Sequence, residues 1–184
     1  MKILAIDLET TSLSWENGQI LSIGAVIEDT TENTPLEKLP IYYKQVVHDT
    51  YHGEIYALNL NKQLLTDILE NKDGNNIHID NLVDDFKNWL YQHYKEDEKI
   101  TVAGKNYGIF DKRFLEKLEG WNTIKFSHRV IDPSILYMDW NNDESLPNLD
   151  ECLKRANINK TVSHNALDDA MDIVNLLRVY RGSR

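Results

Sequence analysis

The chain has 184 residues, of which 41% are hydrophobic, enough to fill the core of one domain of ordinary size. Its 30 acidic residues outnumber its 20 basic residues, giving a net charge of −10. This charge argues against a protein that grips long nucleic acids by neutralising many phosphates. It does not exclude a protein that holds one end of a short strand with the help of bound cations.

Targeting and redox signals are few. No run of about 18 apolar residues is present, so no membrane span is expected. No signal-peptide pattern follows Met1, and Cys152 as the one cysteine rules out an internal disulfide and fits a reducing compartment. No repeat or linker divides the chain. We therefore expect a single domain over residues 1–184 in the cytoplasm.

Apolar and β-branched runs predict strands, and apolar stripes at helical spacing predict helices. The predicted strands cover residues 2–9, 20–28, 41–47, 100–104 and 128–132. The predicted helices cover residues 60–69, 82–93, 110–120, 134–140, 149–158 and 165–180. Three strands, a helical region and then strand–helix–strand–helix indicate an α/β fold with a mixed sheet.

Two acids interrupt the first predicted strand, which reads ILAIDLET at residues 3–10. Alternate residues of a strand share a face, so Asp7 and Glu9 point the same way, about 6–7 Å apart. Like charges at this distance repel, and a divalent cation between them reverses the sign of the interaction. Mg²⁺ is the natural candidate, because hard cations prefer carboxylate oxygens. The alternative is that the strand has already emerged and water solvates both acids.

The last predicted helix separates two neighbouring aspartates. Asp169 lies beside the apolar stripe, whereas Asp168 and Asp172 share the opposite, polar face. His164 precedes this helix by about one turn, close enough to share a site with Asp169.

Asp111 follows the same logic on the helix at residues 110–120, where it borders the core stripe. Its other explanation is a favourable interaction with the helix dipole. Together, Asp7, Glu9, Asp111 and Asp169 can hold two Mg²⁺ ions, an arrangement that recurs in enzymes cleaving phosphodiesters. Mn²⁺ is expected to substitute. A histidine ordinarily titrates near neutral pH, which suits His164 as general base.

Three stretches carry these residues: "DLETT", "NYGIFDKRFL" and "HNALDDA". In this order they resemble the motifs of the DEDD superfamily of 3′–5′ exonucleases. The histidine five residues before the last aspartate resembles the histidine-bearing (DEDDh) branch, which includes oligoribonuclease, ribonuclease T and a polymerase proofreading subunit. Ser12 departs from the pattern, since many relatives have glycine there, and Asn106 lies one residue farther from Asp111 than usual.

The resemblance implies a ribonuclease H-like fold with a five-stranded mixed sheet flanked by helices, forming one exonuclease domain. It implies that the four acids bind two metal ions and that His164 activates water. It also implies a pocket for the terminal nucleotide lined by Thr10, Thr11, Leu13, Asn106 and Phe110.

The leading hypothesis is a metal-dependent hydrolase that releases 5′-mononucleotides from the 3′ ends of single-stranded DNA or short RNA. The alternatives are a proofreading module acting with a polymerase and an inactive module that binds nucleic-acid ends. A polymerase partner is not expected, because the chain ends a few residues after its last predicted helix. The choice between DNA and RNA stays open, as does a homodimer formed through Trp140 and Tyr137.

Overall fold

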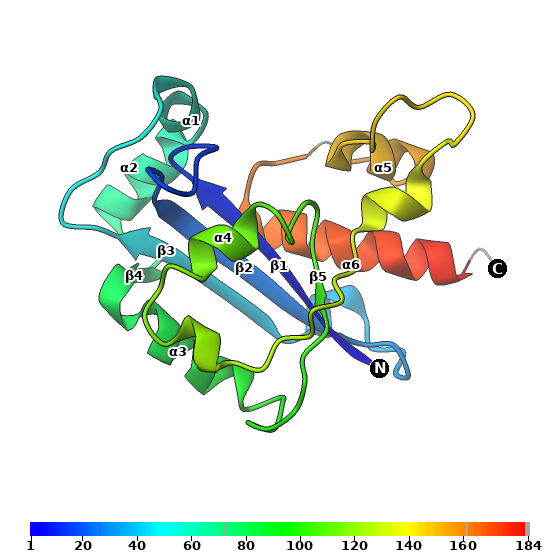
Figure 1. The fold of residues 1–184 in the computed structure, drawn as a ribbon, viewed down its shortest axis with the longest axis horizontal. Coiled ribbons are helices and arrows are strands. Elements are labelled where there is room, and N and C mark those ends of the chain that lie inside the picture. Colours follow the sequence, from blue (N-terminus) through cyan, green and yellow to red (C-terminus); the bar gives the residue numbers. More distant parts are fainter. Residues whose placement is uncertain (72, 161, 183–184) are drawn as a thin grey trace.

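The protein, described from a computed structural model over residues 1–71, 73–160 and 162–182, is built on one five-stranded sheet (Figure 1). The strand order is β4-β3-β2-β1-β5. β1, β2 and β3 are antiparallel neighbours, whereas β5 runs parallel to β1 and β4 parallel to β3. This confirms the predicted mixed sheet. The strands are β1 Lys2–Thr10, β2 Ile20–Asp29, β3 Ile41–Val47, β4 Asn76–His78 and β5 Val102–Ala103.

Six α-helices are described around this sheet, and Figure 1 shows how they surround it. They are α1 Ile55–Leu60, α2 Lys62–Glu70, α3 Leu82–Leu90, α4 Asp111–Leu115, α5 Leu149–Arg155 and α6 Ala166–Gly182. A 3₁₀ turn at Pro133–Tyr137 replaces the helix predicted for residues 134–140. Among the described residues, no helix is both long enough and apolar enough to cross a membrane.

One predicted strand is wrong, and one real strand was not predicted. Residues 128–132 make only an isolated bridge, from Ile131 to Ala103, and Asp132 then turns its carboxylate to accept from the Ser134 N–H. The remaining strand is β4, in a polar stretch that reads as a helix breaker. Its three residues pair with the edge of β3, and their side chains are half-buried. A strand this short and this exposed has no alternation of apolar and polar residues by which the sequence could reveal it.

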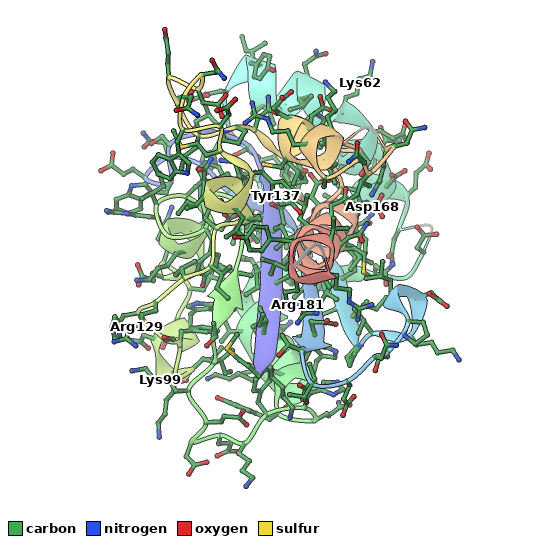
Figure 2. The ribbon with its side chains drawn as sticks, turned by 90° about the vertical axis from the view of Figure 1, so that its right-hand side faces the viewer. Lys62, Lys99, Arg129, Tyr137, Asp168 and Arg181 are labelled. Atoms are coloured by element: carbon green, nitrogen blue, oxygen red, sulfur yellow. The ribbon has the colours of Figure 1, made fainter. Side chains whose placement is uncertain are left out.

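The two faces of β1 pack against different helices, because successive side chains of a strand alternate. Leu4 and Ile6 belong to the core cluster that includes α3, while Ile3 and Ala5 belong to the cluster that includes α6. The same alternation carries Asp7, and Glu9 after it, onto the α6 face. Figure 2 looks almost along α6 and shows it lying beside β1.

Gly24 fixes how closely α6 approaches the sheet. It lies opposite Asp7 in the β1–β2 ladder, and a Cβ atom there would lie 2.2 Å from the backbone of Ala166. Only a residue without a side chain permits this approach. Since Ala166 is the first residue of α6, the contact sets the first turn of the helix, with Asp169, against the end of β1.

We predict that Gly24→Ala lowers the free energy of unfolding by about 2 kcal/mol or more, because overpacking a tight contact commonly costs about 1–3 kcal/mol. Gly108→Ala is the matched control, since a Cβ there meets nothing within 4 Å. The control is expected to stay within about 0.5 kcal/mol of the parent. Urea unfolding followed by circular dichroism measures both. Equal stability of the two variants would show that α6 does not rest on Gly24.

Candidate active site

Three segments that are distant in sequence bring their acids to the end of β1. Asp7 and Glu9 come from β1 itself, Asp111 is the first residue of α4, and Asp169 lies in the first turn of α6. The backbone N–H of Leu8 donates to the Asp111 carboxylate, which ties the start of α4 to the strand. Asp111 is 2% exposed, so its carboxylate is enclosed rather than solvated.

Glu9, His164 and Asp169 form the tightest group of this site. One ligand atom from each lies within 4.8 Å of the others. Glu9 and Asp169 are buried, whereas His164 is exposed. His164 adopts a left-handed backbone conformation with φ of 52°, and the Asn165 side chain that follows accepts from the N–H groups of Leu167 and Asp168.

Burial, with a smaller contribution from neighbouring charges, raises the pKa of each of the four acids. Burial, and then the charges of Asp111, Asp169 and Glu9, raise the pKa of Asp7 well above its ordinary value. Burial, and then Asp169, raise the pKa of Glu9 to about 7. Burial also raises the pKa of Asp111 to about 7, and burial followed by the nearby Asp172 raises that of Asp169 to about 7.

The residues of this site fit a divalent cation. Oδ1 of Asp169 is buried and has no hydrogen-bond partner in the described part of the chain. An unpartnered buried oxygen costs free energy unless something coordinates it. Carboxylates in such number, with one histidine at the margin, are the donors that hard divalent cations take in proteins.

The predicted division of the aspartates on α6 is half right. Asp169 is buried and Asp168 is exposed, as the helical phase predicts. Asp172, predicted on the polar face, is instead 3% exposed and paired with Lys160. The prediction failed because the loop between α5 and α6 covers that side of the helix, which helical spacing cannot reveal.

The residues predicted to line a nucleotide pocket after β1 differ in exposure. Leu13 is 76% exposed, so its side chain is free to meet a ligand. Thr10 and Thr11 are buried, and both hydroxyls have partners: that of Thr10 donates to the Ser12 carbonyl, and that of Thr11 accepts from the Gln19 N–H. A direct role in binding stays a prediction for all three.

Asn106 and Phe110 lie in one turn directly before Asp111. The N–H of Phe110 donates to the carbonyl of Asn106, whose own N–H donates to the Asp132 carboxylate. Asn106 is exposed and Phe110 is half-buried against Phe114. The structure thus sets both beside an active-site acid, and their contact with a substrate stays a prediction.

Asn61, at the break between α1 and α2, is a site residue that the sequence did not indicate. It is 5% exposed, and its side chain hydrogen-bonds to Glu9 and donates to the Thr10 carbonyl at 3.3 Å. This bond lowers the pKa of Glu9 and so opposes the effect of burial. Because more than 50 residues separate the two, no local spacing connects them.

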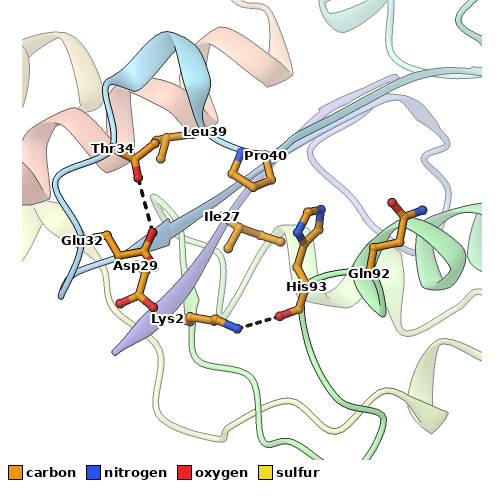
Figure 3. A pocket seen from close by; sticks show the side chains of 9 residues that line it. All are labelled: Lys2, Ile27, Asp29, Glu32, Thr34, Leu39, Pro40, Gln92 and His93. Atoms are coloured by element: carbon orange, nitrogen blue, oxygen red, sulfur yellow. Dashed lines mark hydrogen bonds between the residues drawn. The ribbon is translucent and has the colours of Figure 1, made fainter.

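A hollow lies at the end of β1 opposite the acids (Figure 3). Its lining includes Lys2, whose ammonium donates to the His93 carbonyl at 2.7 Å. Lys2 begins β1, so the strand separates it from Glu9 by about 23 Å at 3.3 Å per residue. This hollow is therefore distinct from the acidic site.

Solved nuclease structures share this fold over nearly the whole chain. E. coli exonuclease I in complex with a 5cy-dT13 oligonucleotide has a TM-score of 0.68 at 12% identity, covering 100% of this chain and 41% of that chain. An exonuclease I from Methylocaldum szegediense gives 0.66 at 12% identity, with 100% and 41% covered. Cell-death related nuclease 4 gives 0.66 at 14% identity, with 99% and 64% covered. At such identities the likeness establishes the fold.

A model of the RNase_T exonuclease family matches residues 4–177. The chain therefore belongs to this exonuclease family, which agrees with the DEDD resemblance of its three motifs. Among curated proteins, none matches the sequence. The chain spans 41% of the length of the exonuclease I chains that it resembles.

We predict that the metal-free protein loses stability as pH rises from about 4 to 7. Glu9, Asp111 and Asp169 have folded-state pKa values of about 7 against ordinary values of 4.5, 3.8 and 3.8, so the folded state binds more protons in this window. Their contribution is fully present below the ordinary values and is lost as pH passes the raised ones.

Thermal melting in EDTA and in Mg²⁺ or Mn²⁺, measured from pH 5 to 8, tests this prediction. A divalent cation should raise the melting temperature most at the alkaline end, since it binds the ionised folded state. Asp169→Asn should flatten the pH dependence in EDTA. A melting temperature that changes with neither pH nor chelator would show that these acids do not repel one another in the folded state.

Proposed function

We propose that the chain is a metal-dependent 3′–5′ exonuclease of the DEDDh type that releases 5′-mononucleotides from single strands. This proposal rests on the convergence of Glu9, His164 and Asp169 within 4.8 Å, and on a buried Asp169 oxygen that has no partner among the residues that the structure describes. The charges of Asp111, Asp169 and Glu9 all raise the pKa of Asp7, as expected if Asp7 and Asp111 lie close to this group. Membership of an exonuclease family supports the same reading.

In this proposal, Asp7, Glu9, Asp111 and Asp169 hold two Mg²⁺ ions, with Mn²⁺ able to replace them. When bound, such ions activate water and stabilise the charge that develops on a phosphodiester. His164 accepts the proton of the attacking water at a ring nitrogen, since one of its nitrogens lies within 4.8 Å of the Glu9 and Asp169 oxygens. Its exposure at the edge of the site lets it pass that proton to solvent.

Single-stranded DNA is the substrate that we propose first. Several of the similar exonuclease I structures contain dT or dA oligonucleotides, and one is described as a complex with single-stranded DNA. The terminal nucleotide would lie against Leu13, with Thr10 and Thr11 shaping the turn behind it and Asn106 and Phe110 on the other side. Short RNA is the alternative, and contacts to the 2′-hydroxyl distinguish the two.

We also propose a homodimer and action without a partner protein. Trp140 is 74% exposed and could contact a second copy of the chain. Tyr137 is less available for such a contact, because its hydroxyl donates to the Leu176 carbonyl of the same chain. Action without a polymerase partner and a cytoplasmic location are likewise proposals from the sequence. A proofreading role and an inactive end-binding role are the competing functions.

The proposal predicts a ladder of products shortened one nucleotide at a time when 5′-labelled DNA or RNA is incubated with the protein and Mg²⁺ or Mn²⁺. His164→Ala should slow this reaction by about 10²–10⁴-fold, the usual contribution of a general base. Asp169→Asn should abolish it, because a buried ligand loses its charge. Asp168→Asn is the matched control, exposed on the same turn, and should keep most of the activity.

Gel analysis of single strands, labelled at either end and both short and long, reads the polarity and the preferred substrate. Equal loss in Asp168→Asn and Asp169→Asn would contradict the assigned helix face. No shortening on any strand, with either metal, would favour the inactive or partner-dependent function.

A further inference from the structure

We infer that the ion pair between Lys160 and Asp172 is a positioning device for His164. The ammonium of Lys160 lies 3.0 Å from one carboxylate oxygen of Asp172 and 2.9 Å from the other. Lys160 belongs to the loop between α5 and α6, four residues before His164, whereas Asp172 belongs to α6. The catalytic consequence rests on the proposed function, but the mechanical link does not.

The pair is anchored on the helix side. Asp172 is 3% exposed and lies three residues after Asp169, about 4.5 Å farther along the helix axis. Burying a carboxylate without a partner is costly, so the buried Asp172 is stabilised by the Lys160 ammonium. Asp172 is already held by helix α6, whereas Lys160 lies in the loop before it, so the contact restrains the loop.

The loop needs such a restraint because His164 is held in an uncommon backbone conformation. A positive φ is infrequent for a residue with a side chain, and His164 has φ of 52°. The other described contact between this loop and the polar side of α6 is the exposed bond from the Ser163 hydroxyl to Asp168, at 3.0 Å. The Lys160–Asp172 pair has a buried acid and two short contacts, so it is the stronger of these two ties, and in our inference it restrains the backbone that carries the imidazole.

Two other roles for these residues are less consistent with the geometry. A lysine that binds a substrate phosphate would be free to turn toward solvent, but this ammonium contacts both oxygens of a buried acid. An additional metal ligand is disfavoured because the positive charge of Lys160 lies 3.0 and 2.9 Å from the two oxygens of Asp172 and would repel a cation there.

The test compares Lys160→Met, Asp172→Asn and Lys160→Arg in the full chain. Lys160→Met and Asp172→Asn should each lower kcat by about 10- to 100-fold, the usual effect of residues that orient a catalytic group. KM should change less than about twofold. Lys160→Arg should retain most of kcat, because arginine also pairs with both oxygens of a carboxylate.

Lys154→Met is the matched control, since this lysine pairs with Asp150 on the exposed side of α5 at 2.6 Å. It should leave kcat and loop exchange unchanged. Amide hydrogen exchange of residues 157–165 gives a readout that needs no activity. Exchange in this loop should quicken in Lys160→Met and Asp172→Asn while the core of α6 stays protected.

The double variant Lys160→Met/Asp172→Asn should lose no more kcat than Lys160→Met alone, because both changes remove one link. A raised KM in Lys160→Met with normal kinetics in Asp172→Asn would overturn the inference in favour of phosphate binding. Lost Mn²⁺ affinity in Asp172→Asn would overturn it in favour of a metal ligand.

The experiments distinguish a variant that fails to fold from a parent protein that lacks nuclease activity. If Lys160→Met does not fold, the isosteric Asp172→Asn carries the same comparison. If the parent protein degrades no strand, the proposed function fails, and exchange alone decides the inference: unchanged exchange in both variants overturns the link, and quickened exchange supports it.

Discussion

Four mutually repelling carboxylates, held together at the end of β1, are the constraint on which the rest of the structure depends. Burial and the charges of the other three acids raise the pKa of Asp7 well above its ordinary value. The apolar clusters on the two faces of the sheet supply the free energy that holds these groups together. Protonation relieves this repulsion at low pH, and a bound divalent cation would relieve it near neutral pH.

The scaffold fixes each acid by a different device. Strand alternation carries Asp7 and Glu9 to one face, the Leu8 N–H ties Asp111 to the same strand, and the Ala166 contact on Gly24 brings in Asp169. His164 differs from the acids because it sits on a loop. Its position depends on contacts made by side chains elsewhere in that loop, and we infer that Lys160 makes the principal one.

The sequence predicts features whose cause is local. The period of a strand placed Asp7 and Glu9 on one face, and the period of a helix separated Asp169 from Asp168. Features caused by distant contacts were not predictable in this way. Asp172 is covered by a loop, Asn61 reaches Glu9 across more than 50 residues, and β4 forms by pairing with β3 without an apolar pattern of its own.

The measurement that tests the central claim most directly is anomalous diffraction from crystals grown with Mn²⁺. The account predicts two peaks about 3.5–4 Å apart, surrounded by the carboxylates of Asp7, Glu9, Asp111 and Asp169. One of them should disappear or weaken in Asp169→Asn. Crystals grown near neutral pH in which these carboxylates surround no peak at saturating Mn²⁺ would contradict the account, because protonation and not metal would then relieve their repulsion.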